Sequence, residues 1–193
     1  MPDGHIDQLL NTLERKTSAE VYYDNFNKGR YATDASIYQM VPYGVLIPKS
    51  NADLVETINY ARESKVPLLA RGGGTSQCGQ TVNNAIVIDN SKYLNKVLEF
   101  DKESMTCVVQ PGIVLDELNR FLKPYGLWFP VDVSTSSRAT IGGMTGNNSC
   151  GGRSIRYGMM RDNVINIEGI LFDGSSYNLS LIHISEPTRL PGI

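Results

Sequence analysis

Arg71-Gly-Gly-Gly-Thr-Ser-Gln-Cys-Gly-Gln80 is the stretch that decides the fold, and it directly follows a short apolar run at residues 66–70. Three successive glycines leave no Cβ atoms in the way, so several backbone N–H groups can approach one oxyanion. Thr75 and Ser76 add two hydroxyl donors. The pattern favours a loop that binds a diphosphate group, and the alternative is a tight glycine-rich turn with a structural role only.

Two better-known phosphate-binding motifs do not fit this loop. A P-loop needs G-x-x-x-x-G-K-[ST]; Gly74 and Gly79 have that spacing, but Gln80 stands where the lysine is required. The dinucleotide fingerprint needs G-x-G-x-x-G, and Gln77 occupies its third glycine position. The loop therefore belongs to neither class.

A second cluster of small residues, Ile141-Gly-Gly-Met-Thr-Gly-Asn-Asn-Ser-Cys-Gly-Gly152, begins seventy residues after Arg71. Taken alone it is also consistent with a flexible loop. Two such loops in one domain suit a long, flat ligand that carries a phosphate bridge between two ring systems. A flavin dinucleotide has this shape more than a mononucleotide does.

Apolar periodicity and turn residues predict the elements around these loops. Helices are expected at residues 5–16, from a cap at Ser50 or Asn51 to about residue 65, and from Gly112 to Pro124. Strands are expected at 41–47, 66–70 and 85–89, and hairpins at 97–109 and 164–179. Residues 21–39 are expected to be irregular, 127–131 extended and 134–152 loop-like. The alternation in the first half predicts an α+β domain of two small lobes.

Composition and charge exclude several classes of protein. The formal net charge is −2, with 18 Lys and Arg against 20 Asp and Glu, so no basic face for nucleic acid is expected. The N-terminus carries charges where a signal peptide would be apolar, and no apolar run reaches the roughly 20 residues of a membrane helix. These features predict a cytoplasmic protein with no transmembrane segment. Cys78, Cys107 and Cys150 form no C-x-x-C pair, so neither a zinc nor an iron–sulfur site is expected.

The two glycine-rich stretches, RGGGTSQCGQ and ATIGGMTGNNSCGGRSIRYGMMRDNV, together resemble the FAD-binding domain shared by vanillyl-alcohol oxidase and p-cresol methylhydroxylase (PCMH-type). Residues 32–50 and 110–143 resemble the D-2-hydroxyacid dehydrogenase branch, which includes D-lactate, glycolate and D-2-hydroxyglutarate dehydrogenases. The likeness covers roughly residues 30–179. It implies a lead-in at 1–40, one FAD-binding lobe at 41–92 and a second, truncated lobe at 93–180.

The resemblance also implies a set of cofactor-binding residues. Those expected to line the pyrophosphate are Arg71, Gly72, Gly73, Gly74, Thr75, Ser76, Gly79 and Gln80. Those expected to border the adenosine and pyrophosphate are Pro130, Asp132, Ser134 and Thr135. Those expected beside the ribityl chain and the ring are Thr140, Ile141, Gly142, Gly143, Met144, Asn147, Ser149, Gly151 and Gly152. Those expected to close the adenine side are Tyr157, Gly158, Val164 and Ile165.

The implied activity is oxidation of a D-2-hydroxy acid by hydride transfer to FAD, with electrons passed to an iron–sulfur centre, a cytochrome or a quinone. Histidine is absent between Ile6 and Ile182, so non-covalent FAD is expected, although Cys78 or Cys150 could form a thioether. The catalytic residues, and any iron–sulfur cluster, are expected in a C-terminal part that follows this fragment. The alternatives are a flavin-binding module or subunit without its own turnover, and another PCMH-type oxidase or reductase.

Residues 181–193, LIHISEPTRLPGI, show neither a helical nor a strand period. They resemble the translation of a sequencing adapter, and we expect this tail to be foreign to the natural protein. The alternative is an ordinary loop that leads into a further domain.

Overall fold

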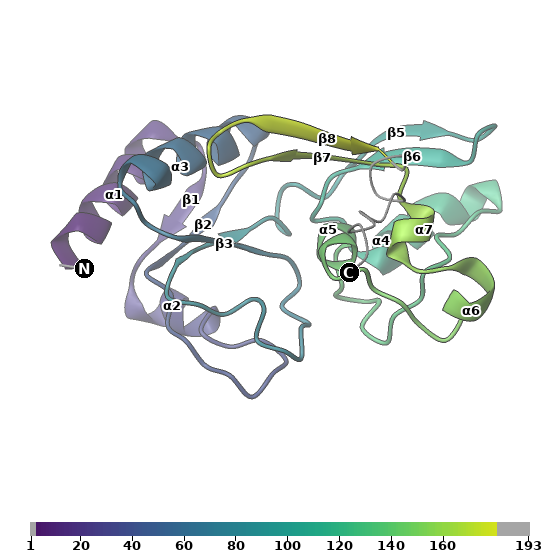
Figure 1. Ribbon diagram of the computed structural model, residues 1–193, viewed down its shortest axis with the longest axis horizontal. Coiled ribbons are helices and arrows are strands. Elements are labelled where there is room, and N and C mark those ends of the chain that lie inside the picture. Colours follow the sequence, from purple (N-terminus) through teal and green to yellow (C-terminus); the bar gives the residue numbers. More distant parts are fainter. Residues whose placement is uncertain (1–2, 181–193) are drawn as a thin grey trace, which may run out of the picture.

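The computed structural model describes residues 3–180, so the expectation for the tail at 181–193 lies outside the described residues. Figure 1 shows two halves side by side. Helices α1 and α3 and a four-stranded sheet form one half, and helices α4 to α7 with hairpin β5–β6 form the other. Each half has its own cluster of buried hydrophobic side chains.

The sheet of the first half has the strand order β1-β2-β4-β3. Its strands are β1 (Glu20–Tyr22), β2 (Gly44–Ile47), β3 (Leu68–Arg71) and β4 (Ile86–Asp89). β1 is antiparallel to β2, whereas β2, β4 and β3 are parallel. The two central strands, β2 and β4, are buried at all four positions, as expected for strands covered on both faces. β3 therefore delivers the first glycine-rich loop at the carboxyl edge of a rigid sheet.

Two helices cover this sheet and pack against each other. α1 (Asp3–Lys16) buries Ile6, Leu9, Leu10 and Leu13 at helical spacing, and α3 (Asn51–Glu63) buries Thr57 and Ala61. α3 begins at the N-cap Ser50, whose hydroxyl accepts from the backbone N–H of Asp53. The carboxylate of Asp53 is almost fully buried and accepts from the backbone of Ser18, Lys49 and Ser50. A single carboxylate thus joins the chain before β1 to the start of α3.

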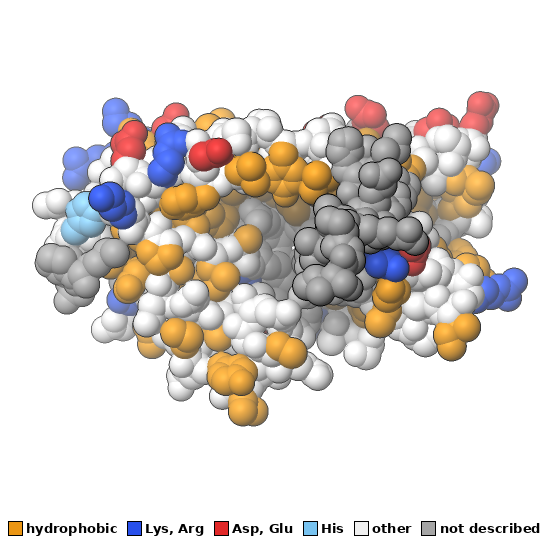
Figure 2. All heavy atoms as spheres, in the orientation of Figure 1, with side chains coloured by type: hydrophobic (Ala, Val, Ile, Leu, Met, Phe, Trp, Pro, Cys, Tyr) orange, Lys and Arg blue, Asp and Glu red, His pale blue; other side chains and the backbone are white. Residues whose placement is uncertain are grey.

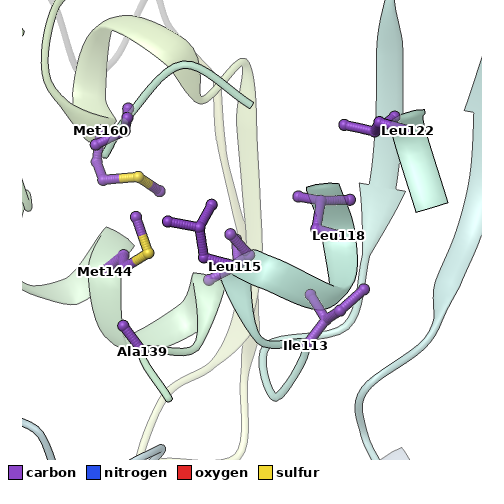
Figure 3. Packing of buried hydrophobic residues seen from close by; sticks show 9 residues of the cluster. Ile113, Leu115, Leu118, Leu122, Ala139, Met144 and Met160 are labelled. Carbon is purple, nitrogen blue, oxygen red and sulfur yellow. The ribbon is translucent and has the colours of Figure 1, made fainter. Parts of the chain in front are cut away.

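The second half is built around an amphipathic helix, α4 (Leu115–Leu122), which continues into the 3₁₀ turn η1 (Lys123–Tyr125). Figure 3 shows Leu115 pointing toward the sulfur-bearing side chains of Met144 and Met160. These methionines lie in two short helices, α5 (Ile141–Gly146) and α7 (Met160–Asn163), and α6 (Ser154–Tyr157) lies between them in sequence. The hairpin β5 (Val97–Asp101) and β6 (Thr106–Val109) packs on the same cluster through Val97, Phe100 and Val109.

A last hairpin, β7 (Asn166–Ile170) and β8 (Ser176–Ser180), reaches back to the first half. In Figure 1 it runs from α7 across to the end of α3. Nη1 of Arg62 on α3 donates to the backbone carbonyl of Asp173 at the hairpin turn. The two halves are therefore joined here as well as at the glycine-rich loops.

The expected fold class, an α+β domain of two small lobes, agrees with this architecture, and the expected helices, strands and hairpins are present with small differences at their ends. Two expectations were wrong. Residues 21–39 are not irregular throughout, because they contain most of β1 and all of α2 (Asn25–Arg30). Residues 134–152 are not loop throughout, because α5 lies within them and is held by burial of Ile141 and Met144. Among residues 3–180, no helix is both long and apolar enough to cross a membrane.

Candidate functional site

The structure brings the two glycine-rich loops into contact at the junction of the two halves. Gly72 lies against Thr140 so closely that a Cβ atom there would overlap Oγ1 of Thr140. Nε2 of Gln80 in the first loop donates to Oδ1 of Asn147 in the second, at 3.0 Å. Two segments seventy residues apart in sequence therefore form one continuous surface.

The first loop offers a row of free backbone donors. Within residues 3–180, none of the N–H groups from Gly72 to Gln77 donates to a protein acceptor. Gly73 and Gln77 are exposed, and the residues between them are half-buried. The hydroxyl of Ser76 contacts Oε1 of Gln80 and accepts from the N–H of Cys78, which closes the loop on itself. Successive unpaired N–H groups on a glycine backbone form a concave donor set that fits a diphosphate.

The second loop is more rigid than its composition indicates. Thr140 caps α5 by accepting from the N–H of Gly143 at 3.3 Å, and it is itself buried. The side chains of Ile141 and Met144 point into the core. Gly143 and Asn147 are exposed, and the N–H of Ser149 is used within the loop, donating to the carbonyl of Met144. What this loop presents to a ligand is therefore its small exposed residues.

Asp132 lies beside the end of the second loop. Its Oδ1 accepts from the N–H of Arg153 at 3.1 Å. The predicted neighbours Pro130 and Thr135 are half-buried, and Ser134 is exposed. The structure thus connects the segment at residues 130–135 with the loop at residues 151–153, as a continuous ligand surface requires.

The last predicted group lies further along the chain, around α6 and α7. The ring of Tyr157 packs edge-to-face on Trp128, with ring centroids 5.3 Å apart. Val164 packs on the core of the second half, whereas Ile165 is 56% exposed. Arg153 stacks over Trp128 at 5.0 Å and Arg156 over Tyr157 at 5.2 Å, so these two arginines lie on an exposed aromatic surface.

Some residues at the site were not predicted as site residues. Tyr38 packs directly on Gly79, and Asp34 accepts from the hydroxyl of Thr81 at 3.0 Å. Both belong to residues 32–50, so the resemblance of that segment was the available signal. Oδ1 of Asn90 is buried beside the carboxyl end of β4, and no partner for it is found in the described chain. Nothing in the sequence singled out Asn90.

An apolar surface lies next to the first loop. Figure 2 shows hydrophobic side chains over the region of α2 and the loops that follow it. The exposed hydrophobic residues of this region are Phe26, Ile37, Tyr38, Met40 and Val41.

Histidine and cysteine are the residues that could attach a flavin covalently. His5 lies on α1, where its Nε2 forms a hydrogen bond with the carbonyl of Ser64 at 3.0 Å. Cys78 and Cys150 are exposed, and burial raises the pKa of the half-buried Cys107. In the part of the chain that the structure describes, no three His, Cys, Asp or Glu side chains are grouped so as to hold a metal ion. What the loops offer chemically is a row of backbone N–H groups, and such groups suit an anion such as a phosphate.

These features define a two-lobed α+β domain whose two glycine-rich loops lie in contact at the junction of the lobes. Residues 42–180 match the family described as FAD binding domain, and the chain belongs to that family. This confirms the resemblance found in the sequence.

The chain is also similar in sequence to known dehydrogenases. The chain is 40% identical over 181 residues, 89% of its length, to D-2-hydroxyglutarate dehydrogenase of Pantoea ananatis. It is 34% identical over 176 residues, 90% of its length, to mitochondrial D-lactate dehydrogenase (cytochrome) of Arabidopsis thaliana. The chain spans only 17% and 30% of these two proteins. The solved structure of an alkyldihydroxyacetonephosphate synthase superposes on this chain with a TM-score of 0.81 at 21% sequence identity. The superposition covers 95% of this chain and 36% of the synthase chain, so the two share a fold.

Proposed function

We propose that this chain binds FAD non-covalently across the contact between its two glycine-rich loops, as the flavin-binding part of an oxidoreductase that acts on a D-2-hydroxy acid. The observation that carries the proposal is the contact of Gly72 with Thr140. It brings the N–H groups of Gly72 to Gln77, which have no acceptor within residues 3–180, next to the second loop. The names of the relatives support the class of substrate.

In this proposal the backbone from Gly72 to Ser76, with Gly79 and Gln80, holds the diphosphate. The segment from Thr140 to Gly152 lies beside the ribityl chain and the ring. The residues at 130–135 border the adenosine, and the residues at 157–165 close the adenine side. The lobe boundaries follow the same division, with one lobe at 41–92 and the other at 93–180.

When bound, FAD supplies the redox chemistry, because its ring accepts a hydride from the α-carbon of the hydroxy acid. The residues of this chain bind the cofactor, orient it and exclude water from its diphosphate. The base that accepts the hydroxyl proton is proposed to lie outside residues 6–182, which contain no histidine. The same observation favours a second candidate for this chain taken alone, a flavin-binding module without turnover.

For the whole enzyme we propose a quinone, a cytochrome or an iron–sulfur domain as electron acceptor. The name of the Arabidopsis relative supports a cytochrome. We propose a cytoplasmic location, with peripheral association at the inner membrane where the acceptor is a membrane quinone.

Titration of the flavin-free chain with FAD tests the cofactor proposal. We expect saturable quenching of FAD fluorescence, competition by ADP, which carries the same diphosphate, and much weaker binding of riboflavin. Absence of saturable binding, or equal binding of riboflavin, would overturn the proposal. The substrate class is tested in the longer natural reading frame that contains residues 1–180, by anaerobic dye reduction with D-2-hydroxyglutarate, D-lactate and glycolate. No reduction with any of the three would overturn that part.

A further inference from the structure

We propose that Arg71 is a positioning residue, which sets the shape of the first glycine-rich loop from within the protein and does not contact the diphosphate. This inference rests on the proposed binding of FAD. The resemblance implies that Arg71 lines the pyrophosphate, and the geometry of the side chain points to a different role.

The guanidinium of Arg71 is already occupied by backbone carbonyls. Nη1 donates to the carbonyl of Tyr31 at 3.3 Å and to that of Thr81 at 3.0 Å, and Nη2 donates to the carbonyl of Thr33 at 2.9 Å. Cζ also lies 5.2 Å from the centre of the Tyr31 ring. A planar guanidinium has five N–H donors in a fixed fork, so these contacts fix its orientation. The side chain thereby ties residues 31–33 to both ends of the loop.

The guanidinium also supports the loop directly. Gly74 has φ +65°, and a Cβ atom there would lie 2.6 Å from Nη2 of Arg71. The backbone of the loop therefore rests on the guanidinium. Moving the guanidinium would remove the support beneath Gly74, which stands between the free N–H groups of Gly73 and Thr75.

Further contacts connect residues 31–35 with the first glycine-rich loop and its flanks, residues 71–81. The carbonyl of Gly74 accepts from the N–H of Ala35 at 3.1 Å, and Asp34 accepts from the hydroxyl of Thr81. The hydroxyl of Tyr31 donates to Asp89 at 2.7 Å. Residues 31–35 and 71–81 thus form one unit, with Arg71 at its centre.

The charge of Arg71 has internal partners. Burial lowers its pKa, and the carboxylates of Asp89 and Asp34 act in the opposite direction. The guanidinium stays charged. Because its N–H groups already donate to three backbone carbonyls, the diphosphate is left to the neutral N–H groups of the loop.

Two substitutions at Arg71 separate positioning from charge. Arg71→Lys keeps the charge and loses the fork, and Arg71→Met loses both. We expect both variants to weaken FAD binding by about tenfold or more, since hydrogen bonds to charged groups are worth this much. We also expect the salt dependence of the dissociation constant to match wild type in both, because screening acts on exposed charge pairs. Arg15→Met, which removes an exposed charge on α1, is the matched control.

A substitution at Asp34 gives a test in which electrostatics and positioning predict opposite changes in FAD affinity. Asp34→Asn removes a negative charge near an anionic ligand, so electrostatics alone would strengthen FAD binding. Positioning predicts weaker binding, because Asp34 accepts from Ser36 and from Thr81 through separate oxygens, and asparagine has only one acceptor oxygen. Tighter FAD binding in Asp34→Asn would overturn the inference. A near-normal affinity in Arg71→Lys, together with a reduced salt dependence in Arg71→Met, would also overturn it, because this pair of results would show that only the charge of Arg71 matters. If wild type itself binds no FAD, the proposed function fails instead.

Discussion

Replacing Gly73 by alanine should abolish tight FAD binding while leaving the fold in place. A Cβ atom at Gly73 would overlap the carbonyl oxygen of Arg138 and lie 3.0 Å from its carbonyl carbon. The favourable separation between non-bonded heavy atoms is about 3.5–4.0 Å. The overlap with the oxygen is the closer of the two contacts, so the loop has to move by about 1 Å or more to relieve it. The atoms it meets belong to backbone, so they cannot rotate away as a flexible side chain could.

This shift moves the neighbouring N–H groups away from the diphosphate. One hydrogen bond to a charged group is worth about 1.5–3 kcal/mol, which corresponds to roughly 10- to 150-fold in affinity. We therefore expect Gly73→Ala to weaken FAD binding at least about tenfold, with Gly73→Val more severe.

Fluorescence titration measures the affinity, and circular dichroism shows that the variant is folded. Gly29→Ala on α2 is the matched control, because a Cβ atom there meets nothing within 4 Å. Arg156→Ala, which removes an exposed charge, should also bind FAD more tightly than Gly73→Ala does. Wild-type affinity in Gly73→Ala would show that the first loop does not hold the cofactor.

Four further predictions follow from the site and the fold. Acid precipitation of the flavin-loaded chain should release all flavin to the supernatant, and flavin that stays with the pellet would indicate a bond to Cys78 or Cys150. Burial acts to raise the pKa of Asp53, but hydrogen bonds from the backbone of Lys49 and Ser18 outweigh it and lower the pKa from its ordinary value of 3.8. The ionised carboxylate therefore stabilises the folded state above pH 3.8, and this contribution to the free energy of unfolding is lost as the pH falls below that value. In urea, Asp53→Asn should therefore cost about 2 kcal/mol at neutral pH and lose this acid dependence, whereas Asp116→Asn, used as the control, should change stability by less than about 0.5 kcal/mol. Asn90→Leu should raise the stability of the flavin-free chain by about 1 kcal/mol, because it removes a buried carbonyl oxygen without a partner, and a lower thermal midpoint would contradict this. Finally, D-lactate, glycolate and D-2-hydroxyglutarate should reduce the bound flavin only in traces while dithionite bleaches it; anaerobic bleaching by a hydroxy acid at about 1 per second or faster would place the active site within this chain.

Local signals predicted most of the fold correctly. Ser50 and Asp53 form the capping box that starts α3, and Asp173-Gly174 turns the hairpin β7–β8. These signals involve residues within a few positions of one another, so the sequence displays them directly. The sequence predicted that both glycine-rich loops serve one elongated ligand, and the structure brings the two loops into contact.

The elements that were missed depend on distant partners. β1 has only three residues and exists because it pairs with β2, and α2 buries none of its six residues and so shows no apolar period. α5 contains three glycines, which oppose helix formation, and it is held by burial of Ile141 and Met144. The orientation of Arg71 could not be predicted either, because its acceptors are backbone carbonyls up to 40 residues away.

The hairpin β7–β8 sets the order in which the chain can complete its fold during synthesis. Arg62 and Asp173, which join the hairpin to α3, are 111 residues apart. At a ribosomal rate of about 5–20 residues per second, Asp173 is added roughly 5–20 s after Arg62. The first half can form its sheet well before that, since β4 ends at Asp89. The end of α3 therefore stays uncovered for several seconds on every ribosome, and the joining of the halves at this point follows the formation of the first sheet.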